Sequence, residues 1–209
     1  MRTPWLAAIA VAATLLTSCS GESSTGVDGG VIIAPEAQLN FLRPATGLTL
    51  SAQTRSFWAV KGQDREVAMY YRPLLSGSDS VRFLRFRVRG SSLLARPDGS
   101  AFATGDSVLI TISTLDFARL ITQFLPSGLT FNPQQPAELR LDFKNANQDF
   151  NRDGVVNQAD ATIAAGFAIW KQEAVGLPWQ KLTSAVEISG GLSEVKADVG
   201  SFTNHAIAY

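Results

Sequence analysis

The chain has 209 residues, of which 45% are hydrophobic and 17% are charged, and its formal net charge is zero. These values predict one globular domain with short appendages and exclude a chain that is disordered throughout. Zero net charge also argues against a nucleic-acid partner. The charge is uneven, however: residues 40–97 hold ten Lys and Arg against three Asp and Glu, and residues 98–209 hold seven against twelve.

The amino terminus has the pattern of an export signal. A positive charge at Arg2 precedes an apolar run over residues 5–16, which is too short to span a bilayer comfortably. The residues Leu16-Thr17-Ser18-Cys19 that follow resemble the lipobox of bacterial lipoproteins. The resemblance implies that residues 1–18 are a signal peptide and that Cys19 is acylated. The alternatives are a plain secretory signal and an uncleaved anchor.

Cys19 is the only cysteine of the chain. A lone thiol is unusual in an exported protein, and acylation would account for it. In lipoproteins of double-membraned bacteria, an uncharged residue such as Ser20 after the cysteine usually accompanies sorting to the outer membrane. The resemblance therefore implies a lipid anchor in the cell envelope, on either the periplasmic or the surface face.

A glycine- and serine-rich segment follows the cysteine. Residues 20–30 lack apolar periodicity, which is typical of a flexible tether. We therefore expect a lipidated cysteine and tether over residues 19–35 and a folded domain over residues 36–209.

Most of the folded domain alternates short β-type runs with turn residues. Residues 56–60 and 66–71 flank the turn signal at 61–64 and predict a hairpin. Residues 138–143 alternate so that Leu139, Leu141 and Phe143 share one face. Further predicted strands occupy residues 81–89, 107–113, 120–124, 184–189, 194–197 and 206–208, and a helical turn is predicted at 116–119.

Many short strands without βαβ alternation predict a mainly β fold, either an antiparallel sandwich or a barrel, and we favour the β-sandwich. Residues 124–131, 136–139 and 202–209 resemble bacterial relatives of the β-sandwich domain of zonula-occludens proteins and netrin receptors. The resemblance covers about the last hundred residues. Residues 145–176 depart from it as an insertion, which we expect to hold a calcium loop followed by an α-helix.

Residues 149–160 have the pattern of a calcium loop. Oxygen-bearing side chains stand at its positions 1, 3, 5, 9 and 12, glycine stands at position 6, and position 7 can offer a backbone carbonyl. Ca²⁺ prefers about six to eight oxygen ligands, and an alternating series around a glycine turn points successive side chains at one centre. The alternative is an Asp- and Asn-rich loop without a metal.

The loop is similar to a dockerin calcium repeat, in which position 12 is aspartate instead of glutamate. The resemblance implies that the ligands of Ca²⁺ are the side chains of Asp149, Asn151, Asp153 and Asp160, the carbonyl of Val155, and Asn157 directly or through water. A true dockerin carries two such repeats and binds cohesin through them. This chain has one, which puts cohesin binding in doubt.

A helix is predicted over residues 158–171, because Ile163, Phe167 and Trp170 recur at helical spacing. This apolar stripe would bury against the sandwich. Calcium binding would then lock the helix to the sheet.

Three weaker signals have both a structural and a functional interpretation. The arginines at 82, 85, 87 and 89 predict a solvated strand face that discourages edge pairing, with contact to an anionic glycan or lipid headgroup as the alternative. His205 is the only histidine, and we expect it to be structural, because no nucleophile motif accompanies it. Trp58, Trp170 and Trp179 predict core packing, with a sugar-stacking platform as the alternative.

No phosphate loop, dinucleotide fingerprint or zinc cluster is present, so the sequence predicts no enzyme. We expect an envelope-anchored, calcium-binding β-sandwich lipoprotein that acts as an interaction or structural module. The alternative is a dockerin-like surface module that binds a protein or a polysaccharide in a glycan-degrading assembly. An exposed helix face beside the calcium loop would favour the alternative.

Overall fold

The structure is a computed structural model that describes residues 27–28, 30–72, 81–189 and 192–209. The predicted signal peptide, the lipobox with Cys19 and most of the predicted tether lie outside the described residues.

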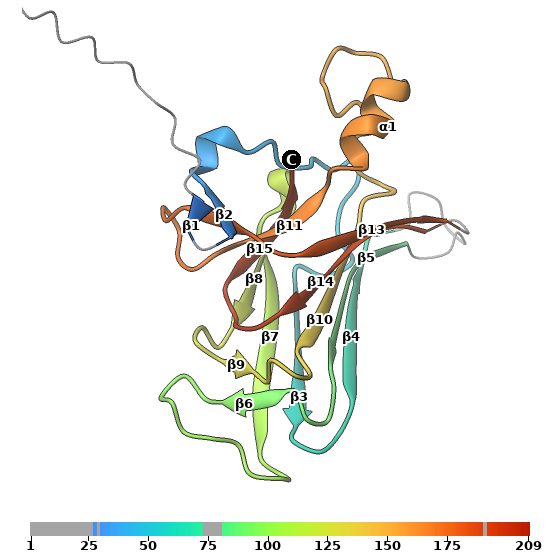
Figure 1. Cartoon of the computed structure of the whole chain (residues 1–209). Helices are drawn as coiled ribbons and strands as arrows, with labels where there is room; N and C mark the ends of the chain where they lie inside the picture. The colour runs from blue at the N-terminus through green and yellow to red at the C-terminus, as the bar shows by residue number, and fades with distance from the viewer. Residues whose placement is uncertain (1–26, 29, 73–80, 190–191) are drawn as a thin grey trace, which may run out of the picture.

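The chain folds as a mainly β, antiparallel sandwich, as predicted (Figure 1). An eight-stranded sheet contains, in spatial order, β1 (Val27–Asp28), β2 (Val31–Ala34), β12 (Trp179–Lys181), β11 (Ala168–Gln172), β15 (Asn204–Ala208), β8 (Ile121–Leu125), β7 (Ser107–Asp116) and β3 (Thr54–Val60). A five-stranded sheet contains β13 (Ser184–Ser189), β14 (Leu192–Val199), β10 (Ala137–Asp142), β5 (Arg82–Val88) and β4 (Arg65–Tyr70).

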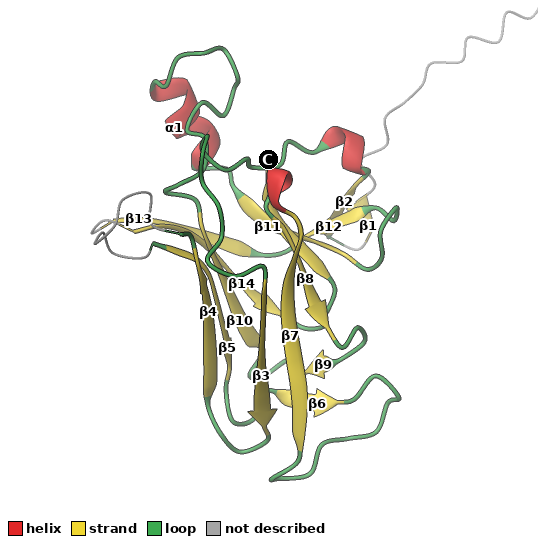
Figure 2. Ribbon diagram, turned by 180° about the vertical axis from the view of Figure 1, so that it is seen from behind, coloured by secondary structure: helices red, strands yellow, loops and turns green. Residues whose placement is uncertain are grey.

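Smaller elements complete the fold. A short ribbon pairs β6 (Leu93–Ala95) with β9 (Thr130–Phe131). The helical segments are the 3₁₀ turns η1 (Glu36–Gln38) and η2 (Phe117–Arg119) and the α-helix α1 (Gln158–Ala164). Figure 2 shows β3, β7 and β8 from the side opposite to Figure 1.

Apolar side chains at alternate positions of the strands fill the space between the two sheets. In β10, Leu139 and Leu141 are buried, and Phe143 just beyond the strand is buried with them, as the sequence predicts. Phe86 of β5 lies at the centre of the core, with its ring 5.1 Å from that of Phe124 of the facing sheet. Apolar side chains at alternate positions of both sheets therefore form one continuous core.

The predicted hairpin over residues 56–71 is wrong. β3 pairs with β7, and β4 pairs with β5, so the turn at 61–64 carries the chain from one sheet to the other. Backbone pairing holds this turn, since the amide of Gly62 donates to the carbonyl of Gly90 at 2.7 Å. Gly90 is required there, because a Cβ at residue 90 would lie 2.9 Å from the backbone of Gly62. Turn residues alone do not distinguish a hairpin from a crossing between sheets.

The predicted helix over residues 158–171 is also wrong in its second half. α1 ends at Ala164, and residues 168–172 form β11 in the interior of the eight-stranded sheet. Phe167 and Trp170 are buried as expected, but on loop and strand positions instead of a helix face. β11 pairs with β15 along five residues and with β12 on its other side, so strand pairing and burial in the sheet override the helical spacing of this short apolar run. The insertion is therefore shorter than residues 145–176.

The amino-terminal segment is part of the fold earlier than predicted. β2 pairs with β12, so residues 31–34 belong to the sheet and not to the tether that we expected over residues 19–35. The chain then crosses the outer face of the eight-stranded sheet. There Phe41 packs on Trp179 with ring centroids 5.0 Å apart and helps to bury a second apolar cluster with Ile121 and Trp170.

Candidate metal centre

The predicted calcium loop and α1 form a lobe, residues 147–166, that stands away from both sheets (Figure 1). Aromatic contacts hold its base. The ring of Phe150 lies 4.9 Å from that of Phe167 at an angle of 85°, and the hydroxyl of Tyr209 donates to the carbonyl of Phe150. The lobe is thus joined to the core on one side and free on the other.

The first half of the loop is wound around its own oxygen side chains. The carboxylate of Asp149 accepts the amides of Asp153 at 3.1 Å and of Gly154 at 2.9 Å. Asn151 accepts the amide of Asp153 at 3.0 Å, and Asp153 accepts the amide of Val155 at 2.8 Å. These bonds bring successive side chains to the inside of one turn.

Two residues of the turn adopt left-handed backbone conformations. Gly154 has a φ of 87°, which glycine adopts without strain, and this explains why position 6 of the loop needs glycine. Arg152 has a φ of 62°, which is uncommon for a residue with a Cβ. The hydrogen bonds of the turn hold Arg152 in this conformation.

Asp160 closes the loop from its far end. One carboxylate oxygen accepts the amides of Phe150 at 2.6 Å and Asn151 at 3.1 Å, and the other accepts the amide of Asn157 at 2.9 Å. These amides, that of Asn157 foremost, hold the pKa of Asp160 below its ordinary value. Asn157 in turn accepts the amide of Ala159 at 2.7 Å, which completes a capping box at the start of α1.

The donor set fits Ca²⁺ by lone-pair accounting. A carboxylate oxygen and a carbonyl oxygen each have two acceptor sites. The oxygens of Asp149, Asn151 and Asp153 each accept one hydrogen bond, as does the carbonyl of Val155, so each keeps one site for a cation. The side-chain oxygen of Asn157 accepts amides of α1 in the capping box, so Asn157 would contact a cation through water. Asp160 keeps one site on one oxygen, because its other oxygen already accepts two amides.

Among the described residues, no group of three or more His, Cys, Asp or Glu side chains is gathered as a metal site. Asp149, Asp153 and Asp160 are therefore not gathered as such a group, and the other predicted ligands are Asn151, Asn157 and the carbonyl of Val155. The fit therefore rests on a mixed set of carboxylate, amide and carbonyl oxygens, which is the set that Ca²⁺ accepts.

The outer side of α1 faces solvent. Asp160 and Ala164 are its buried residues, and Ile163 is half-buried against the core. The exposed positions carry small or uncharged side chains, namely Gln158, Ala159, Ala161 and Thr162. Beside them Val155 and Val156 are 58% and 65% exposed. The predicted burial of a long helix against the sandwich is thus replaced by a short helix with a free face.

A groove of about 570 Å³ adjoins the lobe. It lies beside the amino-terminal segment, and Arg43, Arg119 and Arg152 line it. Arg119 is engaged by Glu36 and Asp116. The sequence analysis missed this cluster because its members come from three distant segments.

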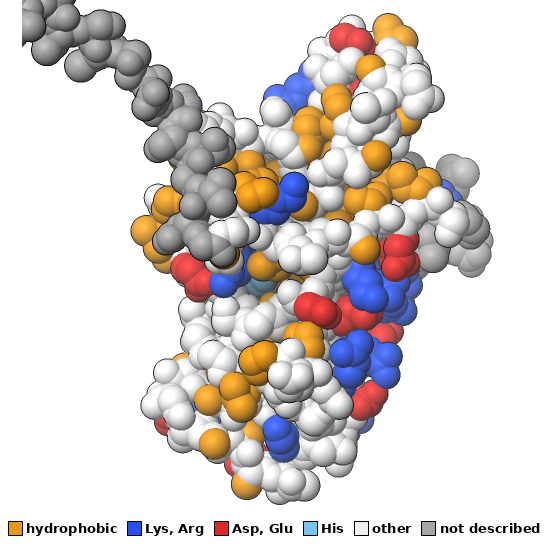
Figure 3. All heavy atoms as spheres, in the orientation of Figure 1, with side chains coloured by type: hydrophobic (Ala, Val, Ile, Leu, Met, Phe, Trp, Pro, Cys, Tyr) orange, Lys and Arg blue, Asp and Glu red, His pale blue; other side chains and the backbone are white. Residues whose placement is uncertain are grey.

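The arginines of residues 82–89 lie on a partly solvated strand face, as predicted, and each of them is also paired with a carboxylate. Glu138, which is nearly buried, contacts Arg140 at 2.8 Å, Lys196 at 3.4 Å and Arg89 at 3.6 Å. Burial alone would raise the pKa of Glu138, but the hydrogen bond and charge of Arg140 and the charge of Lys196 hold it below its ordinary value. Figure 3 shows the mixed charges gathered over this sheet.

Glu194 is a second anion of the same face. It pairs with Arg82 at 2.9 Å and with Arg140, whose guanidinium also reaches Glu187 at 3.0 Å. Arg85, Arg140 and Lys196 stand directly opposite one another on neighbouring strands. Their ion pairs are therefore formed diagonally, with carboxylates that lie farther along the neighbouring strands. The acidic residues Glu138 on β10 and Glu194 on β14 are the sequence feature from which this network of ion pairs could have been predicted.

His205 and the tryptophans have separate roles. His205 is fully buried in β15, and burial lowers its pKa to about 3. Among the described residues its ring nitrogens have no hydrogen-bond partner, so it is a neutral core residue. Trp170 and Trp179 are buried, but Trp58 is 59% exposed, so the expected core packing is wrong for Trp58.

No protein family, curated protein sequence or solved structure matches this chain. Within the part of the chain that the structure describes, no helix is long and apolar enough to cross a membrane.

Proposed function

We propose that this chain is an envelope-anchored, calcium-binding β-sandwich that acts as a non-enzymatic interaction module. Acylated Cys19 would attach it to the membrane. The observation that supports the calcium part is the winding of residues 149–160, in which every predicted ligand except Asn157 keeps a free acceptor site. Bound Ca²⁺ would draw the oxygens of the loop toward one centre and link the first turn of the loop to the start of α1.

The loop residues have distinct tasks in this proposal. Asp149, Asn151 and Asp153 hold the turn by accepting hydrogen bonds from backbone amides, and they offer oxygens to the cation from the first half of the loop. Asn157 and Asp160 cap α1 and offer oxygens from the other. Without the cation the charges of Asp149, Asp153 and Asp160 repel one another, which favours opening of the lobe.

Chelation tests the calcium proposal. We expect the melting temperature to fall in EDTA and to recover with Ca²⁺, with a dissociation constant on the order of 10⁻⁵ to 10⁻³ M, as in other extracellular modules. Asp149→Asn keeps a hydrogen-bond acceptor but removes one charge, and should weaken Ca²⁺ binding by about tenfold or more in titration calorimetry. Asp98→Asn, in an unrelated turn where Asp98 also accepts an amide, is the matched control. Equal melting temperatures with and without EDTA contradict the proposal.

The exposed face of α1 favours docking of a protein partner on the lobe, in the manner of a dockerin. Its small, uncharged side chains and the neighbouring valines suit an apolar partner surface. A partner bound there would sense Ca²⁺, because the same loop positions the helix. Association with glycan-degrading enzymes would be one use of such docking.

A charge placed on this face tests the docking proposal. We expect the wild-type chain to capture a partner from envelope extract in Ca²⁺ and to release it in EDTA, and Ala161→Arg to abolish capture. Ala101→Arg, at an exposed site distant in sequence, is the matched control. Capture that survives both EDTA and Ala161→Arg would exclude the lobe as the docking site.

A further inference from the structure

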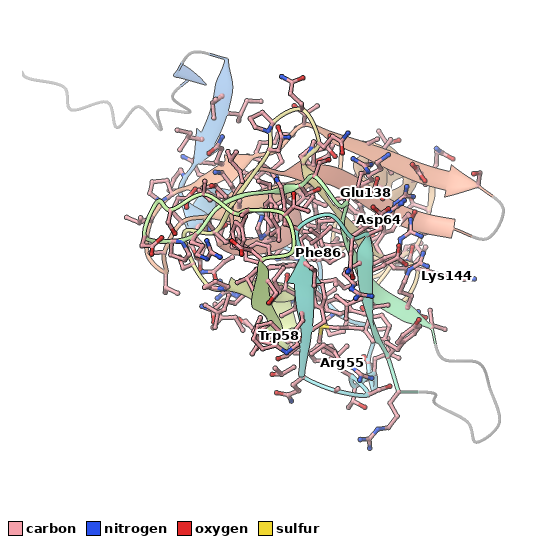
Figure 4. The ribbon with its side chains drawn as sticks, turned by 90° about the horizontal axis from the view of Figure 1, so that it is seen from below. Arg55, Trp58, Asp64, Phe86, Glu138 and Lys144 are labelled. Carbon is pink, nitrogen blue, oxygen red and sulfur yellow. The ribbon has the colours of Figure 1, made fainter. Side chains whose placement is uncertain are left out.

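Trp58 stands on an open sheet face. β3 is the last strand of the eight-stranded sheet, and Trp58 points outward from it, opposite Leu109 of β7 (Figure 4). The neighbouring residues Phe57 and Ala59 point toward the core. An indole that is 59% exposed keeps most of its surface open to solvent or to a ligand.

Rows of hydroxyl side chains continue the same face. Ser56 and Thr111 are hydrogen-bonded across the strands at 2.8 Å, and Thr54 and Ser113 at 3.2 Å. We call these four residues the hydroxyl ladder. Residues two apart in a strand are about 7 Å apart, so the ladder extends about 14 Å from the Trp58 row. Each hydroxyl keeps capacity for a further hydrogen bond.

The face carries no charge at its described outward positions. Those of β3 and β7 beside Trp58 are the hydroxyl ladder, Val60, Ser107 and Leu109, and those of β8 are Gln123 and Leu125. An anionic or cationic ligand would find no counter-charge there. The exposed large apolar side chains of β3, β7 and β8 are Trp58, Leu109, Leu115 and Leu125, which are too few for a stable protein interface of about 800 Å² on each partner.

We propose that the face formed by β3, β7 and β8 binds a neutral polysaccharide. The indole of Trp58 stacks on the C–H face of a sugar ring, since those hydrogens carry partial positive charge and the indole face is electron-rich. The hydroxyl ladder and Gln123 exchange hydrogen bonds with hydroxyls of the following sugars. The site does not depend on the calcium proposal, because it uses no residue of the lobe.

Affinity electrophoresis of the full chain through gels containing soluble β-glucan, xylan, galactomannan or polygalacturonate tests the proposal. We expect retardation by at least one neutral polymer and none by polygalacturonate. Trp58→Ala should weaken retention by tenfold or more, and the double substitution Ser56→Ala with Thr111→Ala by about threefold. Tyr70→Ala removes an exposed aromatic ring from the other sheet and should leave retention unchanged.

Fluorescence gives an independent readout. Trp58 is exposed whereas Trp170 and Trp179 are buried, so a retained oligosaccharide should shift the emission of Trp58 to the blue, and Trp58→Phe should abolish the shift. Four results overturn the proposal: retention by no neutral polymer, retention that Trp58→Ala leaves unchanged, self-association of the chain that Trp58→Ala abolishes, or loss of retention in EDTA. EDTA should leave retention intact, and a loss in EDTA would assign the binding to the lobe instead.

Discussion

The outer face of the five-stranded sheet holds Glu138 and Glu194 among basic side chains, whereas the open part of the other sheet presents hydroxyls and Trp58. On the first face each carboxylate is surrounded by cations, and its hydrogen-bonding capacity is used within the chain. On the second, an indole and a row of hydroxyls keep theirs for solvent or a ligand. One face therefore stabilises the fold, and the other is available for binding.

Glu138→Ala should have the largest effect on this contrast. Its removal leaves Arg140 partly buried without one of its anions, and breaking a buried pair in this way costs about 3 kcal/mol. We expect a clear fall in the denaturant midpoint. Trp58→Ala, on the other face, should leave the midpoint unchanged. Equal losses in the two variants would mean that the two faces do not differ in this way.

His205 should produce the next largest effect, and only at acid pH. Its folded pKa of about 3 lies below the value of about 6.5 in the unfolded chain. The unfolded chain therefore binds a proton that the folded chain does not, and stability falls as pH drops from about 6.5 toward 3, by up to about 1.4 kcal/mol per pH unit.

His205→Leu removes this dependence. Unfolding curves at pH 7 and pH 4.5 should show a smaller loss for the variant than for the wild-type chain, because the carboxylates titrate in both. At pH 7 we expect the variant to be at least as stable, since the buried imidazole has unpartnered nitrogens. A parallel decline of both proteins with pH would be inconsistent with a buried, neutral His205.

Arg87→Ala should have the smallest effect. Arg87 pairs with Asp64 at 2.7 Å, but both side chains are well exposed to solvent. Water and salt screen such a pair, so we expect no measurable change in melting temperature. A loss as large as that of Glu138→Ala would show that exposure does not separate the stabilising pairs from the others.

The sequence predicted the parts of the fold that local pattern controls. The alternating pattern correctly predicted that Leu139 and Leu141 are buried, and most strands end near the turn residues that were expected to end them. It failed where partners are distant: the turn after β3 signals a reversal but not the sheet in which the chain continues. Helical spacing at Phe167 and Trp170 gave a helix because strand and helix patterns overlap in short apolar runs.

The functional sites also differ in how far the sequence predicts them, according to whether their residues are close together in the chain. The loop of residues 149–160 is local, so its ligand set could be written from the sequence. The pairing of Arg82 with Glu194 and the grouping of Trp58 with the hydroxyl ladder join segments more than 50 residues apart. Only the register of the sheets brings them together.

The position of β15 has a consequence for biogenesis. Residues 204–208 lie in the interior of the eight-stranded sheet, between β11 and β8, so its two halves stay separate until this strand has been made and inserted. A chain synthesised from its amino terminus therefore keeps this sheet open until residues 204–208 have been made. Residues 204–208 thus complete the eight-stranded sheet, and such delayed closure would suit the export that we propose for this chain.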